Sequence, residues 1–155
     1  MGTEIERKFL VKDHGWQTQV QRSEQFRQGY LMNEKHLSVR IRSTNDQAWL
    51  TIKGATNRLS RTEYEYSIPK DDAEYLLDEL CTPPLIKKTR HWLQYGAHTW
   101  EVDVFEGDNQ GLVVAEVELD DADESIEFPD WLGEDVSDDP RYLNSSLVRH
   151  PYCQW

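Results

Sequence analysis

The chain is poor in cysteine, which limits how it can be stabilised. Only Cys81 and Cys153 occur among its 155 residues. Two thiols cannot build a disulfide framework or a cysteine-rich metal site, so both classes of small protein are excluded. A reducing compartment is compatible with this composition.

Long apolar segments are also missing. The opening residues show no basic segment followed by an apolar stretch, and no later apolar run approaches the length that crosses a bilayer. We therefore expect a cytoplasmic protein with no membrane partner.

Acidic residues outnumber basic ones. The chain has 17 lysines and arginines and 29 aspartates and glutamates, so its formal net charge is -12. A generic nucleic-acid or anionic-membrane surface is excluded on this ground, so an anionic ligand must be bound locally. The five histidines show no metal-ligand spacing and are expected at the surface or in packing.

The chain nevertheless has enough apolar residues for a core. Its hydrophobic content is 37% and its aromatic content 11%, which fits one compact domain over residues 1–155. We see no linker, low-complexity tract or long repeat.

Alternation of apolar and polar residues predicts a mainly β (α+β) protein with an antiparallel sheet, because several strand candidates are joined by short polar turns. A helix is predicted over 71–81, with Asp71 as its cap and Pro83-Pro84 after its end. The stretch 120–139 is expected to be loop or short helix, and 140–149 a terminal helix. The strand candidates are 3–11, 26–33, 36–44, 47–54, 59–68, 85–95, 98–106 and 112–119.

Most of these strands carry charge on alternate residues and are largely apolar between them. In a single strand, this alternation would simply indicate that the charged side faces water. Together, however, they place like charges side by side, which is unfavourable at an open surface. The charged sets are Glu4, Glu6 and Lys8; Arg40 and Arg42; Lys53; Arg61, Glu63 and Glu65; Lys88 and Arg90; Glu101 and Asp103; Glu116 and Glu118.

This pattern predicts that the charged faces turn inward around a ligand that carries both signs. A metal-bound polyphosphate meets that need, because carboxylates suit Mg²⁺ or Mn²⁺ while Arg and Lys bind phosphate oxygens. A closed β-barrel whose apolar outer face is covered by helices would provide such an interior.

The charged motifs also resemble a known family. Their order along nearly the whole chain is similar to that of the CYTH superfamily, the triphosphate tunnel metalloenzymes, and in particular to bacterial single-domain inorganic triphosphatases. The family's fold, a closed eight-stranded antiparallel β-barrel or triphosphate tunnel, agrees with the strand count. The resemblance rests on Glu4-Ile5-Glu6-Arg7-Lys8, Gln28-Gly29-Tyr30-Leu31, Val39-Arg40-Ile41-Arg42, Thr51-Ile52-Lys53, Arg61-Thr62-Glu63-Tyr64-Glu65, Lys88-Thr89-Arg90, Glu101-Val102-Asp103-Val104-Phe105 and Glu116-Val117-Glu118.

The resemblance implies roles for these residues. Metal ligands are expected at Glu4, Glu6, Glu116 and Glu118, on first and last strands that would be neighbours in a barrel. Phosphate binding is expected at Lys8, Arg40, Arg42, Lys53, Arg61, Lys88 and Arg90. The remaining carboxylates either bind a second metal ion or orient water as general base, or else only pair with nearby cations within the tunnel; these are Glu63, Glu65, Glu101 and Asp103.

The function implied is metal-dependent hydrolysis of tripolyphosphate to pyrophosphate and phosphate, with Mg²⁺ or Mn²⁺ as cofactor. A class IV-type adenylate cyclase and a thiamine or nucleoside triphosphatase remain alternatives. A non-catalytic polyphosphate binder is disfavoured, because carboxylates without metals would repel the ligand. The expected partner is a small-molecule triphosphate and not nucleic acid, and either a monomer or a homodimer fits.

Overall fold

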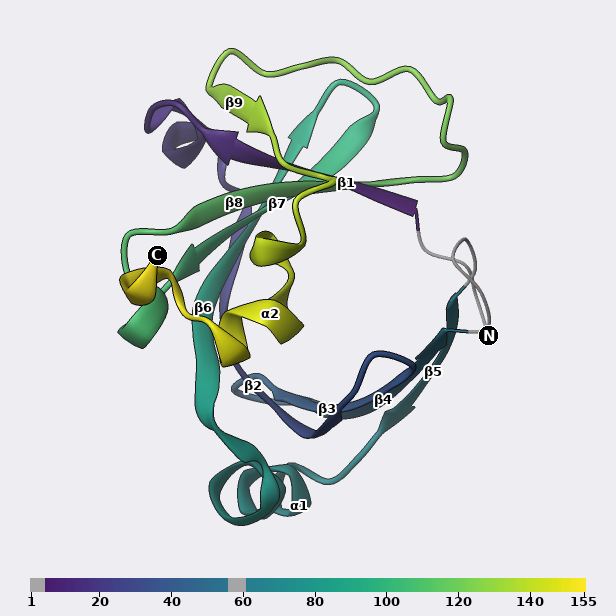
Figure 1. Ribbon diagram of the computed structural model, residues 1–155. Coiled ribbons are helices and arrows are strands. Elements are labelled where there is room, and N and C mark those ends of the chain that lie inside the picture. Colours follow the sequence, from purple (N-terminus) through teal and green to yellow (C-terminus); the bar gives the residue numbers. More distant parts are fainter. Residues whose placement is uncertain (1–4, 56–60) are drawn as a thin grey trace.

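The computed structural model describes residues 5–55 and 61–155, and within them one antiparallel sheet of nine strands forms most of the molecule (Figure 1). The strand order is β5-β4-β3-β2-β6-β7-β8-β1-β9. The strands are β1 (Ile5–Val11), β2 (Arg22–Asn33), β3 (Leu37–Ser43), β4 (Ala48–Ala55), β5 (Arg61–Ser67), β6 (Thr82–Tyr95), β7 (His98–Phe105), β8 (Val113–Leu119) and β9 (Leu132–Asp135).

The sheet curls into a barrel-like ring, which confirms the predicted fold class (Figure 1). Strand β1 pairs with β8, with Glu6 opposite Glu118 and Lys8 opposite Glu116. The first and last predicted strands are therefore neighbours, as expected. The ring differs from a closed barrel in one respect: within the described ranges no ladder joins β5 to β9 or β1.

Strand β9 was not expected, because its segment lies in the stretch predicted to be loop or short helix. It pairs antiparallel with β1, with Val11 opposite Leu132. Its four residues are too few to show alternation. Gly133 allows the close approach, since a Cβ there would lie 2.9 Å from the Leu10 carbonyl oxygen.

A helical segment covers the outer face of β3 and β4. It comprises α1 (Lys70–Tyr75) and a wider turn, η2 (Leu76–Leu80). Its buried Ala73 and Leu77 pack against Ile41 and Ala48, as the predicted apolar stripe requires. The predicted cap was wrong: the helix begins after Pro69, which places Asp71 inside the first turn, where its charge complements the helix dipole.

A second cluster lies on the outer face of β1, β7 and β8. Phe9, Trp100 and Val117 are buried there together with Trp131, which precedes β9. Two outer clusters thus bury the apolar side of the sheet, so its other side must face the interior of the ring.

The C-terminal segment packs over one end of that interior, where the inner face changes from charged to apolar. Predicted helix 140–149 is observed as η4 (Pro140–Tyr142) and α2 (Asn144–Arg149). Leu147 and Val148 of α2 pack with Tyr30, Ile86 and Phe105 of the sheet. No helix in the described part of the chain has the length and hydropathy needed to cross a bilayer.

Candidate active site

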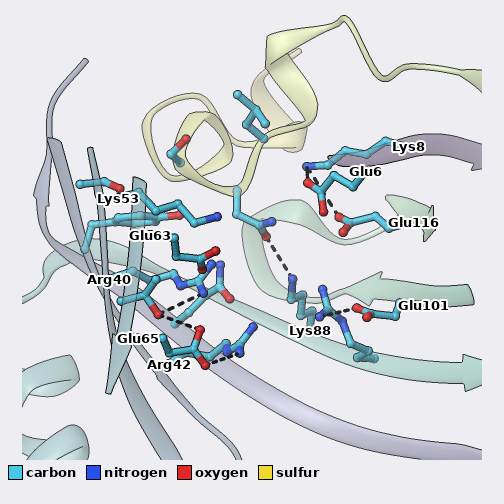
Figure 2. Close-up of a pocket in the computed structure, with 18 of the residues that line it drawn as sticks. Glu6, Lys8, Arg40, Arg42, Lys53, Glu63, Glu65, Lys88, Glu101 and Glu116 are labelled. Carbon is cyan, nitrogen blue, oxygen red and sulfur yellow. Dashed lines mark hydrogen bonds and ion pairs between the residues drawn. The ribbon is translucent and has the colours of Figure 1, made fainter. Parts of the chain in front are cut away.

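The ring encloses a cavity of about 450 Å³, into which most of the predicted charged residues point (Figure 2). The predicted residues that line it are Glu6, Lys8, Arg40, Arg42, Lys53, Glu63, Glu65, Lys88, Arg90, Glu101, Glu116 and Glu118. The charged faces therefore point inward, as the like-charge doublets predicted. This placement follows from period-two alternation once the other face is packed against helices and loops.

One wall of the cavity is rich in carboxylates. Neighbouring strands β1, β8 and β7 place Glu6 opposite Glu118, and Glu101 opposite Glu116. Lys8 lies among them, with its Nζ 3.6 Å from Glu116 Oε1 and 3.9 Å from Glu6 Oε1. Burial raises the pKa of Glu101, and nearby Glu116 raises it further against the opposing effect of Arg90. Negative charge is thus crowded on this wall.

The facing wall, formed by β3 and β4, is rich in cations. It presents Arg40, Arg42 and Lys53, and β5 beside it adds Glu63 and Glu65. Arg42 Nη2 lies 3.8 Å from Glu65 Oε1. Burial, followed by the positive charges of Arg40 and Arg90, lowers the pKa of Arg42 to about 10. An anion entering the cavity would relieve this repulsion.

A buried network joins the two walls through β6 and β7. Lys88 Nζ donates to Asp103 Oδ2 at 2.8 Å, while Arg90 donates to the same carboxylate from Nε at 2.7 Å and from Nη2 at 2.9 Å. Arg90 Nη1 also lies 2.5 Å from Glu101 Oε2. Burial alone would raise the pKa of Asp103, but Lys88 and Arg90 hold it well below its usual range. Burial lowers the pKa of Lys88 to about 8.

This arrangement of carboxylates and cations can be compared with known protein families. The CYTH domain model matches residues 2–152. The chain belongs to the CYTH family. The resemblance drawn from the charged motifs is therefore confirmed.

Two curated relatives of this CYTH protein are named inorganic triphosphatase. The protein of Acetivibrio thermocellus is 47% identical over 152 residues, covering 98% of this chain and 97% of the relative. That of Nitrosomonas europaea is 34% identical over 150 residues, covering 94% and 97%. Among solved structures, the inorganic triphosphatase NE1496 superposes with a TM-score of 0.71 at 31% identity, covering 96% of this chain and 95% of that chain.

Three predicted site residues of the CYTH protein are not among the described residues that line the cavity. Glu4 and the side chain of Arg61 lie outside the described residues. Asp103 is on the same inward-facing side of β7 as Glu101. It is only 1% exposed, because Lys88 and Arg90 cover it. Its place beneath these cations suits it to hold them in position, and other groups would reach a ligand first.

Other residues also line the cavity, although no role was predicted for them. Gln28 and Tyr30 are alternate residues of β2 whose side chains point inward. They could have been predicted by applying the alternation to uncharged residues as well as charged ones. Asn144 accepts a hydrogen bond from Lys88 Nζ at 3.3 Å. It comes from α2, where no strand periodicity could signal it. The unassigned lining residues are Gln28, Tyr30, Ser38, Thr51, Leu143, Asn144 and Ser145.

Proposed function

We propose that this CYTH protein hydrolyses inorganic tripolyphosphate to pyrophosphate and phosphate, with Mg²⁺ or Mn²⁺ as cofactor. The observation that carries the proposal is the enclosed cavity with a carboxylate wall facing a cationic wall. The 47% identity to a relative named inorganic triphosphatase supports it. We place the activity in one cytoplasmic CYTH domain over residues 1–155, as a monomer or homodimer with a small-molecule substrate.

The carboxylate wall fits a hard divalent cation. Among the described residues, no three acidic, histidine or cysteine side chains form a ready-made metal cluster. Mg²⁺ does not need one, since it is usually bound by one or two carboxylates together with water and substrate phosphate oxygens. We assign this role to Glu6, Glu116 and Glu118, and to Glu4 by its place in the motif. The ion would neutralise charge on the phosphate chain and lower the pKa of a bound water.

The cations would bind the phosphate chain along the other side of the cavity. Guanidinium groups suit phosphate because they donate two parallel hydrogen bonds, whereas a lysine supplies a compact charge. In phosphoryl transfer, such fixed charges stabilise the negative charge of the transferring group. The residues assigned to this role are Lys8, Arg40, Arg42, Lys53, Arg61, Lys88 and Arg90.

The attacking water needs an acceptor for its proton. Glu101 is the best placed of the remaining carboxylates, because it lines the cavity beside Glu116 and burial raises its pKa. Glu63 and Glu65 lie across the cavity, next to the cations, and are assigned to orienting them or a second metal ion. Asp103 acts through Lys88 and Arg90 as a positioning residue.

A substrate panel tests the proposal. Purified protein is incubated with tripolyphosphate, ATP or thiamine triphosphate and with Mg²⁺ or Mn²⁺, and both phosphate and cyclic AMP are measured. We expect phosphate release from tripolyphosphate to have the highest kcat/KM and to stop on addition of EDTA. Cyclic AMP from ATP would identify a cyclase instead, and metal-dependent release from thiamine triphosphate or ATP alone would assign another triphosphatase. If tripolyphosphate binds but is not hydrolysed, the protein is a non-catalytic polyphosphate-binding protein.

The pH dependence tests the role of Lys88. Because burial lowers its pKa to about 8, its positive charge is complete below that pH and is lost above it. We expect kcat/KM for tripolyphosphate with Mg²⁺ to fall as pH rises through about 8, since this parameter reports groups of the free enzyme. In Lys88→Arg the fall should move to higher pH, because a guanidinium stays charged.

Lys87→Arg is the matched control. Lys87 immediately precedes Lys88 in β6 and is exposed on the opposite face. It should retain the wild-type profile, and thermal melts at pH 7 and 9 would confirm that all three proteins remain folded. An unchanged alkaline limb in Lys88→Arg would show that the limb does not come from Lys88.

A further inference from the structure

Two arginines of the cavity are held in different ways. Arg90 is clamped by carboxylates, with three of its nitrogens within 2.9 Å of Asp103 or Glu101 oxygens. Arg42 has one carboxylate at a longer distance, 3.8 Å to Glu65. Its Nε is buried and has no hydrogen-bond partner in the described part of the chain. The position of Arg42 must therefore be maintained by something other than short ion pairs.

Aromatic rings supply that contact. The guanidinium carbon of Arg42 lies 5.4 Å from the ring centroid of Phe26 and 5.2 Å from that of Trp49. Attraction between a cation and a ring face holds the guanidinium without occupying its N–H groups, which point outward from the rim of the group. Arg42 can thus be fixed in place while its donors are kept for a ligand.

Phe26 also contacts the second arginine. It lies on β2, between the strands that carry Arg42 and Arg90, and the Arg90 guanidinium carbon is likewise 5.4 Å from its ring centroid. The ring is 5% exposed and is itself supported by Trp92, with centroids 6.0 Å apart. Two cations that repel each other therefore share one fixed, electron-rich surface.

Neither ring reaches the ligand space. The cavity is lined by Arg42 and Arg90 but not by Phe26 or Trp49. Any effect of the rings on the reaction must then pass through the arginines.

We propose that Phe26 and Trp49 are positioning residues that hold Arg42, and in the case of Phe26 also Arg90, at the spacing required to bind the phosphate chain. This inference rests on the proposed function. Trp49 and Phe26 act together on a guanidinium whose Nε has no hydrogen-bond partner among the described residues, a property that Arg40 shares. Arg42 is accordingly one of the positions from which the cationic wall donates to the substrate.

The test replaces each ring by an aliphatic side chain. Phe26→Leu and Trp49→Leu are expected to raise KM for tripolyphosphate about tenfold, with a smaller change in kcat, because a desolvated cation–π contact is worth about that factor. Trp49→Phe keeps a ring and should stay near wild type. Calorimetric titration with tripolyphosphate in EDTA should show the same loss of affinity, without relying on turnover.

Phe9→Leu is the matched control. Phe9 is 3% exposed and Arg7 lies over its ring at 5.0 Å, but this pair belongs to the outer face. Its substitution removes a similar buried ring and a similar cation contact away from the cavity. It should lower the melting temperature and leave KM unchanged.

A double-mutant cycle separates positioning from general packing. In an Arg42→Met background, Trp49→Leu should have little further effect on tripolyphosphate affinity, since the ring acts through Arg42. Additive losses, or a KM in Phe26→Leu and Trp49→Leu no higher than in Phe9→Leu, would overturn the inference. If the wild-type protein neither binds nor hydrolyses tripolyphosphate, the proposed function fails instead, so the two failures are distinct.

Discussion

Glu116→Gln is expected to lower kcat for tripolyphosphate about 100- to 1,000-fold while leaving the fold intact. Glu116 lies at the centre of the carboxylate wall, opposite Glu101 on one side and Lys8 on the other. Glutamine has nearly the same size but removes the negative charge that would bind a divalent cation. Losing a preorganised charge of this kind typically has an effect of that size on phosphoryl or acyl transfer.

The measurement is a rate assay across a titration of Mg²⁺, with a thermal melt for each protein. Glu118→Gln, on the same face, should show a loss in the same direction. Glu79→Gln is the control, because Glu79 is exposed on the outer helical segment and is not one of the residues that line the cavity. Wild-type turnover with an unchanged metal requirement in Glu116→Gln would remove this residue from the mechanism.

Asp103→Asn is expected to destabilise the protein by about 3–5 kcal/mol, because it leaves the buried Lys88 and the partly buried Arg90 without their shared carboxylate. Lys88 is 2% exposed and Asp103 1%, so water cannot replace the lost charge. For a domain of this size, such a loss corresponds to a fall of about 10 °C in melting temperature. Turnover should fall as well, since Lys88 and Arg90 would no longer be held in place.

Asp139→Asn provides a matched comparison at the surface. Asp139 also binds an arginine through two oxygens, with Arg141 Nε 3.1 Å from Oδ1 and Nη2 2.8 Å from Oδ2, but Arg141 is exposed and Asp139 is partly exposed. Its substitution should change the melting temperature by little. If the two variants lose equal stability, burial of the Asp103 network does not increase the effect of removing its carboxylate charge.

The pH dependence of the Asp103 effect has a defined sign. The folded-state pKa of Asp103 is depressed, so its stabilising contribution is present above the unfolded value of about 3.9 and is lost as pH falls through the folded value. Titration of Asp103 itself should therefore add no pH dependence to the stability difference between wild type and Asp103→Asn between pH 5 and 7. Chemical denaturation at several pH values measures it.

The sequence by itself determined the strand pattern and most of the site. Alternation is a local property, because successive side chains of a strand point to opposite faces. A doublet such as Glu116 and Glu118 therefore shares a face whatever the strand packs against. Repeated like-charge doublets then predicted an enclosed ligand, and the residues predicted to surround it come from every wall of the cavity.

Only the tertiary structure decided how each inward residue is buried and which groups it contacts. Asp103 and Glu101 have the same parity, yet one is buried beneath cations and the other lines the cavity. The contacts of Phe26, Trp49 and Asn144, and the pairing of β9, join segments that are distant in the sequence. Burial and electrostatics are set by the neighbours that the fold brings together in space, and alternation along one strand carries no information about them.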